Sequence, residues 1–112
     1  MTNKKFVLPD NIKIGGHEVK IKFPYKFTER FDQYAQCDNG LDEIKIQHID
    51  AGGIKFPEIH ILVSLMHEIY HRIDSITGHL VFNDHESAIV GHSEMMVQVL
   101  LENQELLELF KK

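Results

Sequence analysis

The chain has 112 residues, 43% of them hydrophobic and 26% charged, and its formal net charge is −5. This length predicts a single domain over residues 1–112, and the composition excludes disordered and low-complexity classes. The acidic balance argues against a nucleic-acid partner. No apolar run is long enough to span a bilayer or to form a secretory signal, so we expect no membrane partner and a cytoplasmic location.

One cysteine and eight histidines are the unusual features of the composition. Cys37 has no second cysteine with which to form an internal disulfide, which suits a reducing cytoplasm. Histidine is the commonest metal ligand in proteins, so the histidine count raises the question of a metal site.

The first half of the chain has the alternating pattern of β-strands. Hydrophobic residues alternate with polar ones over 12–14 and over 19–23, and Gly15-Gly16 lies between the two runs. This pattern predicts a hairpin whose second strand ends at Pro24. The stretch 25–37 fits either a third strand or a helical turn. A turn at Asp38-Asn39-Gly40 precedes a further strand from Ile44 to about Ile49.

The second half of the chain has the pattern of helices. Pro57 and Glu58 are typical of a first helical turn, and Gly78 is a natural end after Thr77. We expect a second helix, capped by Asn83 or Asp84, to run to about Asn103, with 104–110 either continuing it or forming a separate turn. The predicted fold class is α+β, with N-terminal antiparallel hairpins or a small sheet followed by two main helices.

The first predicted helix contains the pattern H-E-x-x-H, as His67-Glu68-Ile69-Tyr70-His71. Residues four apart lie about 40° apart around a helix, so both imidazoles point the same way and can share one ion. Glu68 is close enough to reach a metal-bound water, which is the general-base position of a metallohydrolase.

The rest of this helix has two distinct faces, which supports the metal interpretation over a solvated polar face that happens to carry two histidines. The polar stripe comprises His60, His67, His71 and Asp74. The opposite, apolar face comprises Leu62, Leu65, Met66, Ile69, Ile73 and Ile76.

A catalytic zinc site needs a third protein ligand and one open position. Asp74 is too far along the helix axis from His67, so we look to the second helix, where Glu86 shares the apolar side. A carboxylate on an apolar face is costly unless it is paired or bound to metal. Glu86 could instead form a capping box with Asn83, and His79, His85 and His92 remain alternative ligands.

At these residues the chain resembles the zincin metallopeptidases, in the branch where H-E-x-x-H is joined by a downstream glutamate. It resembles more closely the small single-domain zincin-like proteins that bacteriophages and prophages of low-GC bacteria encode. The resembling stretches are Ile14-Gly15-Gly16, Cys37-Asp38, Ile44-Lys45-Ile46, 65–71 and 83–103.

The resemblance implies a minimal zincin-like fold in which His67, His71 and Glu86 bind Zn²⁺ and Glu68 activates water. It also implies a location in the cytoplasm of a bacterial host.

Three functions are compatible with the sequence. The first is a zinc-dependent hydrolase acting on a peptide or protein substrate, which the strand from Ile44 to His48 could align as a sheet edge. The second is a non-catalytic zincin-like protein that binds metal and acts through protein–protein binding. The third, a nucleic-acid-binding accessory protein, is disfavoured by the charge and by the lack of a basic run.

Overall fold

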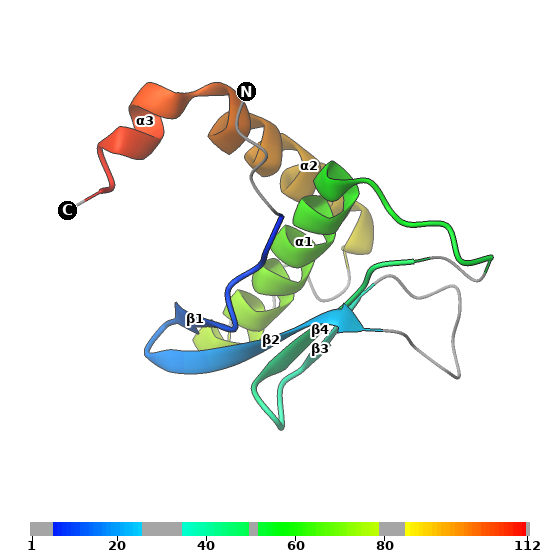
Figure 1. Cartoon of the computed structure of the whole chain (residues 1–112). Helices are drawn as coiled ribbons and strands as arrows, with labels where there is room; N and C mark the ends of the chain where they lie inside the picture. The colour runs from blue at the N-terminus through cyan, green and yellow to red at the C-terminus, as the bar shows by residue number, and fades with distance from the viewer. Residues whose placement is uncertain (1–5, 26–34, 50–51, 79–84, 112) are drawn as a thin grey trace.

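The computed structural model describes residues 6–25, 35–49, 52–78 and 85–111, and it has an α+β fold, as predicted (Figure 1). The strands are β1 (Asn11–Ile14), β2 (His17–Tyr25), β3 (Ala35–Asp38) and β4 (Glu43–Gln47). The helices are α1 (Glu58–Thr77), α2 (Glu86–Glu102) and α3 (Gln104–Glu108). No helix in these ranges is long and apolar enough to cross a membrane.

The four strands form one mixed sheet in the order β1-β2-β4-β3. β1 pairs antiparallel with β2, β3 pairs antiparallel with β4, and the inner strands β2 and β4 pair in parallel. The prediction that the strand beginning near Ile44 is a sheet edge is therefore wrong, because β3 covers that side of β4. Part of the ambiguous stretch 25–37 forms this edge strand, and residues 26–34 lie outside the described ranges.

The predicted hairpin turns at Gly15-Gly16, with Ile14 directly opposite His17. Both glycines have positive φ, 55° and 85°, which a two-residue turn of this kind requires. Gly15 also lies against the end of α1, since a Cβ atom there would come within 2.9 Å of Ile76 Cγ2. The glycine therefore serves the packing of the hairpin as well as its turn.

The prediction that Pro24 ends the second strand is wrong, since β2 continues to Tyr25. The register between β2 and β4 shifts between Lys22 and Tyr25. Proline has no N–H to donate to a ladder, and an irregularity in the pairing lets the strand pass through it.

The helix boundaries follow local signals. α1 begins after Pro57 and ends at Gly78, whose left-handed φ of 73° and N–H bond to the Asp74 carbonyl (3.0 Å) confirm the predicted end. α2 begins at Glu86 with His85 as its flanking residue, while the predicted caps at 83 and 84 lie outside the described ranges. α2 ends at Glu102, and 104–108 form the separate helix α3.

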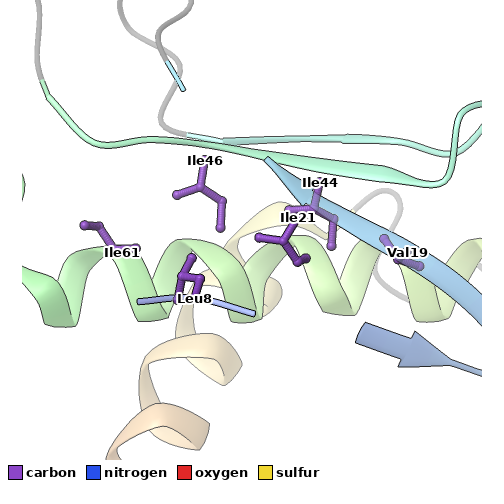
Figure 2. Packing of buried hydrophobic residues seen from close by; sticks show 6 residues of the cluster. All are labelled: Leu8, Val19, Ile21, Ile44, Ile46 and Ile61. Carbon is purple, nitrogen blue, oxygen red and sulfur yellow. The ribbon is translucent and has the colours of Figure 1, made fainter. Parts of the chain in front are cut away.

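The core lies between one face of the sheet and α1 (Figure 2). Alternate residues of β2 and β4 point toward the helix, as expected for a sheet with one covered face. The buried cluster comprises Leu8, Val19, Ile21, Ile44, Ile46 and Ile61. Leu62, Leu65 and Ile69 of α1 pack against it as predicted, whereas Ile73 is 39% exposed and lies outside the contact.

α1 lies between the sheet and α2, so the helix has neighbours on two sides (Figure 1). α2 packs on α1 through the face that carries its buried residues, Ile89, Ser93 and Val97. This arrangement presents one side of α1 to the start of α2, where the candidate site is found.

Candidate metal centre

His67 and His71 project from the same side of α1, one helical turn apart. Their ring centroids are 5.0 Å apart, and their side chains are partly buried. The four-residue spacing therefore brings the two imidazoles together, as the pattern predicts. The other two residues of the predicted polar stripe, His60 and Asp74, line the same groove as the histidine pair.

Glu86 brings a carboxylate to this pair from α2. Its Oε1 lies 2.5 Å from His67 Nε2, and its Oε2 lies 3.3 Å from His71 Nε2. One donor atom from each of the three residues lies within 4.8 Å of the others, and this is the candidate ligand group found among the described residues. The structure thus unites the three residues that the sequence singled out, and metal binding by them stays a prediction.

The helical wheel placed Glu86 correctly on the side of α2 that faces α1, but the expected burial is wrong. The Glu86 side chain is 59% exposed because it lies in the first turn, beyond the packed part of the helix. Glu86 is also the first residue of α2, whereas a capping box needs its acid at the third position. The geometry therefore favours contact of the Glu86 carboxylate with the two histidines over a capping role.

The two alternative ligands that the structure describes do not join the group. His85 precedes α2 and is exposed, and His92 is exposed with its ring 6.3 Å from that of Tyr70. His79 lies outside the described residues.

The chemistry of this donor set fits zinc. Two imidazole nitrogens and one carboxylate form a recognised three-ligand zinc set, which leaves a fourth position for water or substrate. All three side chains are partly accessible from a common groove, so water or a small molecule could reach an ion that they held.

Glu68 is the buried acid of the site, with only 7% of its surface exposed. Burial and, after it, the negative charge of Glu86 raise its pKa to about 7, and a hydrogen bond from the backbone N–H of Cys37 works in the opposite direction. A carboxyl group with this pKa can both accept and release a proton near neutral pH.

A groove of about 1070 Å³ runs past these residues. Residues of α1, β3 and the start of α2 line it, and His67, Glu68, His71 and Glu86 are among them. Ala35 and Cys37 are lining residues from β3. The candidate ligands, the buried acid and the edge strand therefore share one groove.

Cys37 lies beside Glu68 without the character of a reactive thiol. Burial raises its pKa to about 11, and the charge of Glu68 contributes in the same direction. Its Sγ lies 3.3 Å from Asn39 Oδ1. The thiol therefore stays protonated at neutral pH, which disfavours roles as a ligand or a nucleophile.

The sequence interpretation missed Arg72, which is buried next to the site at 5% exposure. Its guanidinium donates to Asn39 Oδ1 (3.0 Å) and pairs with the carboxylate of Asp42. The sequence shows only that an arginine follows Glu68 by four residues on an amphipathic helix. Its partners, Asn39 and Asp42, could not be predicted, because they are brought to it by the packing of the β3–β4 turn on α1.

Comparison of the chain with protein-family models, with curated proteins and with solved structures gives no match.

Proposed function

We propose that this chain is a zinc-dependent hydrolase that cleaves peptide bonds. The observation that carries the proposal is the position of a buried carboxylate, Glu68, beside a two-histidine, one-glutamate group in a single groove. A structural metal site has no use for such a neighbouring base, whereas a hydrolytic site requires one.

His67, His71 and Glu86 would hold the ion. Zinc in such a site supplies Lewis acidity, which lowers the pKa of a bound water and polarises a substrate carbonyl. Glu68 takes a proton from the attacking water and returns it to the leaving amine. Its pKa near 7 suits both transfers, and the Cys37 N–H holds its carboxylate in place.

The strand edge supports a peptide as the substrate class. β3 is at the edge of the sheet and lines the groove together with α1 and α2. An extended peptide can add to a strand edge through main-chain hydrogen bonds, and β3 rather than the strand near Ile44 is the strand so placed. The Cys37 N–H is already bound by Glu68, so such pairing would use other main-chain groups of β3.

The resemblance to small zincin-like proteins supports the same proposal. It implies the same three ligands and the same base, and it implies a bacterial cytoplasm as the location. The groove supports the same proposal, because residues of β3, α1 and α2 in this one domain line it together.

The test compares the native chain with Glu68→Gln, using Glu94→Gln as the control because Glu94 also lines the groove. Metal analysis should find about one zinc per chain in all three proteins. Cleavage of peptide pools at neutral pH should fall by about 10²- to 10⁴-fold in Glu68→Gln, the range typical of general-base loss. Glu94→Gln should cleave at close to the native rate.

Two results would reject the proposal. One is a native protein that binds no zinc, and the other is a Glu68→Gln variant that cleaves as fast as the native chain. Zinc binding with no cleavage of any pool would favour the non-catalytic, partner-binding alternative.

A further inference from the structure

Two residues of α1 hold the same short segment of chain. Glu68 accepts a hydrogen bond from the Cys37 N–H, and Arg72 donates to Asn39 Oδ1 at 3.0 Å. The two positions on α1 lie about 6 Å apart along the helix axis. Their partners are the third residue of β3 and the first residue of the turn that follows it, so α1 contacts this segment at two neighbouring points.

Arg72 also fixes the turn that follows β3. Its guanidinium pairs with Asp42, lies 3.3 Å from His17 Nδ1 and lies 3.5 Å from Ser75 Oγ. Asp42 has a left-handed φ of 53°, and its carbonyl accepts the Lys20 N–H at 2.9 Å. The turn is thus tied to β2 by its backbone and to α1 by a buried arginine.

This attachment matters because β3 is a short edge strand. Among the described strands, this four-residue strand pairs with β4 alone. Contacts with α1 then determine how closely the strand approaches the helix. Arg72 is the buried partner of this ion pair and Asp42 is 40% exposed, so loss of Asp42 would leave the guanidinium charge buried and uncompensated.

We propose that Arg72 is a positioning residue that holds the end of β3 against α1 and thereby keeps the Cys37 N–H on the Glu68 carboxylate. With one carboxylate oxygen engaged by Cys37, the orientation of the other toward the groove is fixed. The catalytic meaning of this orientation rests on the proposed function, whereas the attachment itself does not.

The experiment follows the Cys37 amide proton by NMR in the full chain with zinc added. Arg72→Met removes the charge and the donors, and Arg72→Lys keeps the charge with a single point of attachment. Val97→Ala is the control, because it destabilises the protein from a buried position on α2 that is remote from β3.

In Arg72→Met the Cys37 amide should exchange about 10-fold faster or more relative to the Ile46 amide, the change expected on loss of a hydrogen bond to a charged group. Its proton resonance should move upfield, while zinc content is retained. Arg72→Lys should recover part of both changes. Val97→Ala should speed exchange throughout and leave the Cys37 resonance in place.

An unchanged Cys37 amide in Arg72→Met would overturn the proposal. If that variant does not fold, Asp42→Asn supplies the test, since it removes the charge partner of Arg72 from a partly exposed position; an unmoved Cys37 amide there rejects the proposal equally. On a cleaved peptide, Arg72→Met should lower kcat with little change in KM. A moved Cys37 amide in a protein without turnover would support the attachment and reject the proposed function, so the two failures are distinguishable.

Discussion

Glu68 has an ionisation that differs between the folded and the unfolded chain. Its pKa is about 7 in the folded protein, against an ordinary value of 4.5, because burial and the charge of Glu86 disfavour the carboxylate. Between these two values the folded state keeps a proton that the unfolded state has lost. Metal-free protein should therefore lose stability as pH rises from 4.5 to 7, with the full penalty present above pH 7 and none below pH 4.5.

This linkage gives a prediction for Glu68→Gln in the metal-free protein. The amide cannot ionise, so the variant should be more stable than the native chain at pH 8, by up to about 3 kcal/mol for a shift of this size. At pH 5 most of that difference should vanish. Urea unfolding in the presence of a chelator measures both values, with the exposed Glu94→Gln as the control. A gain of equal size at both pH values would contradict the assigned cause.

At the scale of the element, the start of α2 contributes the third donor to a pair that belongs to α1. We expect Glu86→Ala to weaken zinc binding by about 100-fold, since four-ligand sites worth roughly 10–16 kcal/mol imply about 3 kcal/mol for each ligand. Glu94→Ala, two turns further along α2, should leave the affinity close to native. Competition with a fluorescent chelator measures both constants. Equal losses in the two variants would mean that Glu86 is not the ligand.

The β1–β2 hairpin provides a second element-scale prediction. Gly15→Ala and Gly16→Ala both place a side chain at positive φ, but only the Gly15 change brings a Cβ atom within 2.9 Å of Ile76. We expect Gly15→Ala to cost about 1–3 kcal/mol more than Gly16→Ala, the range typical of overpacking. Equilibrium unfolding in urea gives the comparison, and equal losses would show that the hairpin does not bear on α1.

The features that sequence alone could predict are those set by neighbours along the chain. Pro57 and Gly78 mark the ends of α1, and the spacing of His67 and His71 puts them on one side of it. The side of α2 that faces α1 could also be predicted, because the helical positions of Ile89 and Val97 follow from their spacing in the sequence. The same spacing identified Glu86 as a candidate ligand, but it did not predict that the Glu86 side chain is exposed.

The features that escaped prediction depend on contacts between distant segments. The parallel pairing of β2 with β4, and the place of β3 at the edge, follow from packing rather than from alternation. The bond from Cys37 to Glu68 and the partners of Arg72 exist only once β3 lies beside α1. The predicted strand end at Pro24 was wrong for a related reason: the shift in register between β2 and β4 lets the strand continue through the proline.

At the scale of the whole molecule, α2 has little support apart from α1. In the described chain it packs against α1 and α3 and makes no packing contact with the sheet. An ion bound by His67, His71 and Glu86 would therefore join α2 to the rest of the fold.

Removal of metal should consequently loosen one part of the molecule more than the other. We expect a chelator to increase amide exchange in α2, at Ile89 and Val97, more than in β2 and β4, at Ile21 and Ile46. Saturating zinc should raise the unfolding midpoint, because a ligand that binds only the folded state stabilises it by about 2.7 kcal/mol at one hundred times its dissociation constant. Hydrogen exchange with and without chelator tests the first effect, and uniform exchange changes would contradict it.

Glu86 comes from a separate helix, and its side chain is 59% exposed, so the third donor differs from the two histidines in being replaceable from solution. A free carboxylate can occupy the space that Glu86→Ala leaves, so acetate should restore zinc affinity to that variant in a dose-dependent way. The same replacement is closed to His67→Ala, whose missing donor is an imidazole held directly on α1, and there added imidazole is the matching rescue.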